Sequence, residues 1–81
     1  MSDAWNLDLD DGVLTVELRA GIESTEFERL YDGIVREISA VEAVLIDVGG
    51  IQMTSTGSQL LDSLVAQLEA RGLTVTVLRR P

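Results

Sequence analysis

The stretch that decides the fold is Asp-Val-Gly-Gly-Ile-Gln-Met-Thr-Ser-Thr-Gly, residues 47–57. It follows residues 43–46, Ala-Val-Leu-Ile, a wholly apolar run typical of a strand buried on both faces. After it, apolar residues recur with the spacing of one helical face: Leu60, Leu61, Leu64, Val65 and Leu68. A strand that ends in glycines, followed by a helix that opens with hydroxyl side chains, predicts an α/β domain with its functional site at this junction.

Two alternating segments near the N-terminus predict a hairpin. In residues 5–9 and again in residues 14–18, apolar side chains alternate with polar ones, which is the period of a half-buried strand. Asp10-Asp11-Gly12 lies between the two segments, and an Asp-Gly pair favours a tight turn because both residues tolerate positive φ. The chain is therefore expected to open with two antiparallel strands.

Two amphipathic segments predict helices. The first segment has an apolar stripe made of Phe27, Leu30, Tyr31, Ile34, Val35 and Ile38. Thr25 and Glu28 have the spacing of a capping box, in which a hydroxyl and a carboxylate satisfy two free amides at the start of a helix. Thr56 and Gln59 fit the same box before the second stripe, and Gly72 fits the position just after that helix.

A last strand is expected at residues 73–77, where Leu and Val alternate with Thr. The element order is then β-β-α-β-α-β. Each helix connects two strands by a crossover, and such crossovers join parallel strands with a right-handed turn. The prediction is one mixed sheet with helices packed on it, in a single domain that spans residues 1–81.

The composition indicates a globular chain. Of its 81 residues 46% are hydrophobic and one is Pro, which is enough apolar surface to bury a core. No apolar run approaches the roughly 18–20 residues that span a bilayer, and residues 1–5 lack the pattern of a signal peptide. We therefore expect a cytoplasmic protein that does not insert directly into a membrane.

Three residue types are missing from the sequence, and their absence excludes several kinds of chemistry. The chain contains no Cys, no His and no Lys. Thiolate and imidazole metal sites, Cys nucleophiles and His-assisted triads are excluded, as are Schiff bases and phosphate loops that depend on Lys. We expect no catalytic residue, no metal site and no cofactor, and a protein that works by binding rather than by catalysis.

The net charge of −8 is unevenly distributed. Residues 1–47 carry 12 Asp and Glu against 3 Arg, a balance of −9, whereas residues 48–81 carry 2 acidic residues against 3 Arg, a balance of +1. Most of the surface should repel a phosphate backbone, so nucleic acid is not an expected partner. The acidity fits either a highly soluble surface or an acidic docking face.

Three interpretations fit the hydroxyl run Thr54-Ser55-Thr56. The first is helix capping, since Ser and Thr are preferred N-caps and the two glycines before the run let the chain turn. The second is an anion site at the positive end of the helix. The third is a phosphorylated hydroxyl, where roughly −1.5 to −2 added charges would change how a partner docks.

The same region resembles the STAS family, the sulfate-transporter and anti-sigma-factor-antagonist domain. The resemblance rests on residues 44–51, Val-Leu-Ile-Asp-Val-Gly-Gly-Ile, then a short hydroxyl motif, a helix, Arg71-Gly72 and a strand of Val and Leu. The preceding hairpin and helix follow the family order, so the resemblance covers most of the chain. It implies a STAS-like mixed β-sheet with helices packed on it, lacking the C-terminal helix that family members usually have after the last strand.

Two alignments with the family motif, which runs Asp-Ser-Ser-Gly, name different phosphate acceptors. With Gly57 on the motif glycine, Thr54 replaces the acid and Ser55 is the acceptor. Counting from Asp47 instead places Ser55 on the acid and Thr56 on the acceptor. The run Ser-Thr-Gly-Ser is then similar to the Asp-Thr-Gly-Gly of the STAS subunit in the bacterial phospholipid-trafficking ABC transporter. Neither alignment keeps the acid, and Asp47 is the carboxylate expected near the loop.

The resemblance implies a regulatory protein-protein interaction domain. An anti-sigma factor antagonist would bind a kinase-like anti-sigma factor and would be released by phosphorylation of Ser55 or Thr56. The alternative is a non-catalytic STAS subunit that docks on an ABC transporter ATPase of the phospholipid-trafficking type and stabilises it. In both cases the implied partner-binding residues are Asp47, Thr54, Ser55, Thr56, Gly57 and Ser58.

Overall fold

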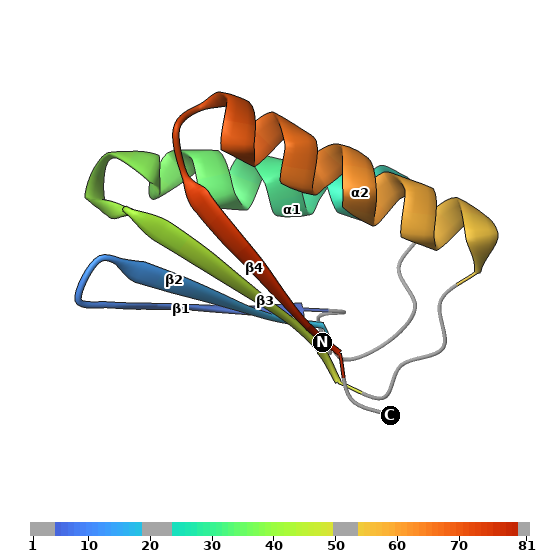
Figure 1. Cartoon of the computed structure of the whole chain (residues 1–81), viewed down its shortest axis with the longest axis horizontal. Helices are drawn as coiled ribbons and strands as arrows, with labels where there is room; N and C mark the ends of the chain where they lie inside the picture. The colour runs from blue at the N-terminus through green and yellow to red at the C-terminus, as the bar shows by residue number, and fades with distance from the viewer. Residues whose placement is uncertain (1–4, 19–23, 50–53, 80–81) are drawn as a thin grey trace.

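Four strands form one mixed sheet in the computed structural model, which describes residues 5–18, 24–49 and 54–79 (Figure 1). Strand β1 spans Trp5–Asp10, β2 Val13–Leu18, β3 Ala43–Gly49 and β4 Thr74–Arg79. Their order across the sheet is β1-β2-β3-β4. Strands β1 and β2 are antiparallel, whereas β2, β3 and β4 run parallel to one another. The mixed sheet predicted from the sequence is confirmed.

The turn between β1 and β2 has the geometry that the Asp-Gly pair predicts. Asp11 has a φ of 50° and Gly12 a φ of 80°, so both lie in the left-handed region that a type I′ turn requires. Asp10 pairs with Val13 directly across this turn. The predicted hairpin is therefore confirmed.

Both helices lie on the same face of the sheet (Figure 1). Helix α1 spans Ser24–Arg36 and, with the short 3-10 helix η1 (Ile38–Ala40), connects β2 to β3, while α2 spans Ser55–Ala70 and connects β3 to β4. The two crossovers advance in the same direction across the sheet, and because such crossovers share one hand, they place their helices on one side. Neither described helix is long and apolar enough to cross a membrane.

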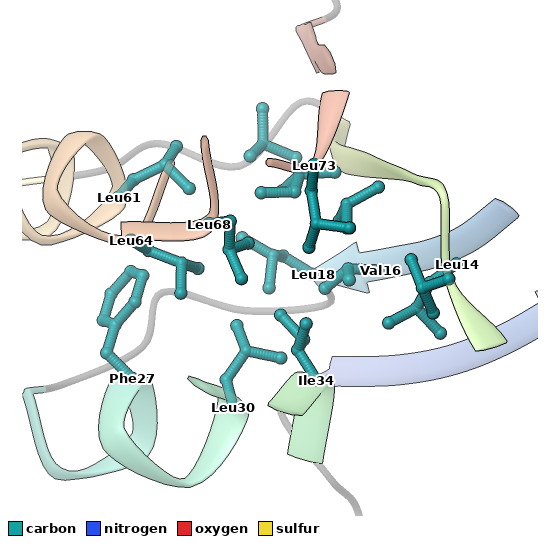
Figure 2. Packing of buried hydrophobic residues seen from close by; sticks show 14 residues of the cluster. Leu14, Val16, Leu18, Phe27, Leu30, Ile34, Leu61, Leu64, Leu68 and Leu73 are labelled. Carbon is teal, nitrogen blue, oxygen red and sulfur yellow. The ribbon is translucent and has the colours of Figure 1, made fainter. Parts of the chain in front are cut away.

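The hydrophobic core fills the space between the helix layer and the sheet (Figure 2). In that view Phe27, Leu30 and Ile34 point from α1 into this space, so the stripe predicted for the first helix faces the core. No polar or charged side chain of the described residues is buried. The core consists of Leu14, Val16, Leu18, Phe27, Leu30, Ile34, Val41, Val44, Ile46, Val48, Leu61, Leu64, Leu68 and Leu73.

The prediction that the central strand is buried on both faces is wrong. Burial alternates along β3: Val44, Ile46 and Val48 are buried, and the residues between them are half-buried. The buried set faces the helices, because both helices cover the same side of the sheet. No helix of the described residues covers the opposite face of the sheet, which we call the open face.

The observed helix ends agree only in part with those predicted from the sequence. Helix α1 begins at Ser24, one residue before the predicted cap at Thr25, and the side chains of both residues lie outside the part of the structure that is described. At the end of α2, Gly72 has a φ of 90° and its amide donates to the carbonyl of Glu69 at 2.9 Å. The predicted role of Gly72 in closing this helix is confirmed.

Candidate functional site

The N-cap of α2 is Thr54, not the predicted Thr56. Thr54 has an extended backbone (φ −69°, ψ 166°), and its Oγ1 accepts a hydrogen bond from the Gly57 amide at 3.0 Å. Its carbonyl accepts from the Ser58 amide at 2.9 Å, which is the first bond of the helix ladder. The predicted capping box of Thr56 and Gln59 is therefore wrong, because α2 begins two residues earlier than that box requires. The residue at the box position is Gly57, which has no side chain to bond back.

The next two hydroxyls lie on the first turn of α2 in positions that solvent can reach. Ser55 and Thr56 are exposed, Ser58 is half-buried and Gly57 is buried. The first amides of a helix lack intrahelical partners and carry its positive partial charge, and the first turn of α2 contains no acidic residue. The first turn thus presents two hydroxyl groups in a locally electropositive place on an otherwise acidic chain.

Asp47 lies apart from these hydroxyls. Its Oδ1 accepts a hydrogen bond from the Gly49 amide at 2.8 Å. Side chains alternate along a strand, so Asp47 projects to the open face, beside its cross-strand neighbour Glu17, while α2 lies on the other side. Gly49 has a φ of 54°, which fits the turn expected at the paired glycines, but Gly50 and residues 51–53 lie outside the described residues. The structure therefore groups Thr54, Ser55, Thr56, Gly57 and Ser58 and separates Asp47 from them.

A contact between the helices had no counterpart in the sequence analysis. The Arg71 Nε donates a hydrogen bond to the Tyr31 hydroxyl at 2.8 Å. The guanidinium carbon of Arg71 also lies 5.6 Å from the centre of the Tyr31 ring, within the range of a cation–π contact. The two residues are 40 positions apart, so no local pattern could have paired them. This contact ties the end of α2 to the middle of α1.

Replacing Thr54 with Ala should destabilise the domain by about 0.5–2 kcal/mol, because the Gly57 amide loses its partner at the start of α2. Urea denaturation followed by circular dichroism would measure this loss. The matched control is Thr54→Ser, which keeps the accepting oxygen and should remain close to the parent. An alanine variant as stable as the parent would show that Thr54 does not cap α2.

Comparison with known proteins places the fold but not a family. No protein-family model and no curated protein matches the chain. Among solved structures, a crystal structure of the protein Mglu aligns with 94% of this chain and 19% of its own, at a TM-score of 0.77 and 18% identity. A crystal structure of Mglu in its native form aligns with 93% of this chain and 23% of its own, at a TM-score of 0.74 and 18% identity.

The chain thus spans only about a fifth of the length of the Mglu chains that it matches, 19% and 23%. At 18% identity the likeness shows the fold alone. The fold is a mixed α/β arrangement of four strands and two helices, consistent with a STAS-like α/β fold.

Proposed function

We propose that the chain is a regulatory protein-protein interaction domain of the anti-sigma-factor-antagonist type, switched by phosphorylation at the start of α2. The observation that carries this proposal is the exposed pair Ser55 and Thr56 next to a separate cap residue. Because Thr54 already provides the capping oxygen, helix capping does not account for the two hydroxyls that follow it. The exposure of both side chains would let a kinase reach either one.

The proposed switch transfers one phosphoryl group. A kinase-like anti-sigma factor moves the terminal phosphoryl group of ATP to the hydroxyl oxygen of Ser55 or Thr56; the hydroxyl loses its proton, and ADP leaves. The added negative charge interacts favourably with the positive N-terminal end of α2, so phosphorylation does not disrupt the helix itself. At a docked interface the same charge adds repulsion and desolvation cost, which releases the partner. Dependence on ATP places this switch in the cytoplasm.

The alternative is a constitutive subunit that docks on a transporter ATPase through the same turn. In that role the first turn of α2 would still bind the partner, but Ser55 and Thr56 would not be modified. The state of these two hydroxyls in the cell therefore separates the two functions.

Mass spectrometry of the protein purified from its own host should show a gain of about 80 Da, the mass of one phosphoryl group. Fragmentation across residues 43–71 should place the group on Ser55 or Thr56 and so decide between the two motif alignments. The control is the double variant Ser55→Ala, Thr56→Ala, which should show no such gain. If the parent chain carries no phosphate during growth or under stress, the constitutive subunit becomes the favoured function.

A further inference from the structure

A groove runs between α1 and α2. Its volume is about 430 Å³. Its floor is apolar and is formed by Phe27 and Tyr31 from α1 and by Leu60 and Leu64 from α2. Figure 2 shows the Phe27 ring pointing from α1 toward Leu64 of α2, so the two helices meet at the bottom of this groove. Leu60 and Tyr31 are only half-buried and leave apolar surface accessible. The groove starts beyond the first turn of α2 and is distinct from the surface around Ser55 and Thr56.

The two walls of the groove differ in charge. On the α1 wall, Glu28 and Asp32 are exposed and lie four residues apart, on the same side of the helix. On the α2 wall, Ser63 and Gln67 are neutral and bond to each other, with Gln67 Nε2 donating to Ser63 Oγ at 3.3 Å. The described residues that line the groove include no cation. Arg71 contacts Tyr31 but is not part of this lining, and the two carboxylates of Glu28 and Asp32 outweigh its single positive charge. A molecule that binds in the groove would therefore contact an apolar floor and one negatively charged wall.

We propose that this groove binds a cationic amphipathic helix of a partner protein. A groove between two packed helices accepts a third helix, whose side-chain ridges fit between theirs. Such a helix would lay its apolar face, spaced i, i+3, i+4, i+7, on the floor of the groove. Glu28 and Asp32 are about 6 Å apart along the helix axis, which matches Lys or Arg residues spaced i, i+4 on the incoming helix.

A second copy of this chain does not fit the groove. The chain has a net charge of −8, and its own helix α1 carries the acidic wall, so two copies would bring like charges together. In the described helices the only cations are Arg29 and Arg36 of α1, which are seven residues apart, so neither helix offers Lys or Arg residues spaced i, i+4. Charge complementarity therefore selects a basic partner segment over self-association.

A synthetic helical peptide of Leu and Lys, with Leu at i, i+3, i+4 and i+7 and Lys on the opposite face and flanks, is a suitable probe. Titrated into the isotope-labelled chain and followed by NMR, it should shift the amide signals of the groove residues. A peptide with Glu in place of Lys should not. Binding should weaken when salt is raised from about 0.05 M to about 0.5 M, because the contacts to the acidic wall are screened.

The decisive comparison uses two variants with the same change in charge. The groove variant Glu28→Gln, Asp32→Asn should bind the Lys peptide about tenfold more weakly than the parent. The control variant Asp8→Asn, Asp10→Asn alters two exposed carboxylates on β1 and should bind like the parent. All four positions are exposed, so both variants should fold, and thermal unfolding would verify this.

Equal weakening in both variants would overturn the proposal, because it would mean that the peptide binds the acidic surface in general. Shifts confined to the open face of the sheet would overturn it as well. The proposal does not rest on phosphorylation: Ser55→Asp should bind the peptide as the parent does. Loss of the switch and loss of the groove site would therefore be seen in different experiments.

Discussion

Replacing Leu68 with Ala is expected to lower the free energy of unfolding by about 2–5 kcal/mol. Leu68 is 0% exposed and lies on the core side of α2, near the end of the helix. Truncation removes buried apolar atoms and leaves a cavity that the surrounding core side chains fill only in part. A domain of this size has a total stability of roughly 4–12 kcal/mol, so the variant should be partly or wholly unfolded near physiological temperature.

Urea denaturation followed by the fluorescence of Trp5, the one tryptophan in the chain, would measure the loss. The matched control is Glu69→Ala, at the adjacent and exposed position, which should change the stability by no more than about 0.5 kcal/mol. If Leu68→Ala and Glu69→Ala had the same small effect, the packing of α2 on the sheet would be contradicted.

The elements that the sequence predicted correctly are those fixed by local patterns. The hairpin follows from strict alternation on both sides of Asp11-Gly12, because only a tight turn with positive φ joins such strands with two residues. The stripe from Phe27 to Ile34 needs a helix to bring its members to one side. Gly72 closes α2 because glycine adopts the required φ without strain.

The burial of β3 was mispredicted for a reason that lies outside the sequence pattern. A run of apolar residues shows that a strand is central, but not which of its faces the helices cover. That depends on the order of the strands in the sheet, which here sends both crossovers the same way. The same order leaves Asp47 on the open face, because it alternates with Ile46 and Val48. The alternation of side chains predicts that Asp47 lies on the other face of the sheet from Ile46 and Val48. It does not predict which of the two faces α2 covers.

The cap of α2 was ambiguous because Thr54, Ser55 and Thr56 all suit the position by residue type. The choice depends on where the chain from β3 enters the helix, and it falls on the residue with extended backbone, Thr54. The groove between the helices could not be predicted from the sequence, because its walls come from segments more than 25 residues apart. The sequence predicted the position of the hydroxyl run, but the structure gives the capping role to Thr54 and not to Thr56.

Negative charge at Ser55 or Thr56 should have the largest effect on partner binding. These exposed residues form the first turn of α2, and the proposed partner would cover them. Aspartate in place of either hydroxyl imitates part of the charge of a phosphoryl group and would place an unpaired carboxylate inside the interface. The resulting repulsion and desolvation should weaken binding by about 100-fold or more. Alanine removes only a hydroxyl and should bind within about twofold of the parent.

The control for added charge is Ala66→Asp, an exposed position more than two turns further along α2. It lowers the net charge by the same amount but lies away from the first turn, so it should leave binding unchanged. Thr54 should stay intact in all of these variants, because its cap holds the turn in place.

The most direct test of the proposed switch is a calorimetric titration of the protein that co-purifies with the chain from its host. The parent chain, the Ser55→Ala and Thr56→Ala variants, the Ser55→Asp and Thr56→Asp variants and Ala66→Asp would each be titrated. We expect the alanine variants and Ala66→Asp to bind like the parent, and aspartate at Ser55 or Thr56 to weaken binding by about 100-fold or more. Unchanged binding by both Ser55→Asp and Thr56→Asp would contradict a docking surface switched at the start of α2.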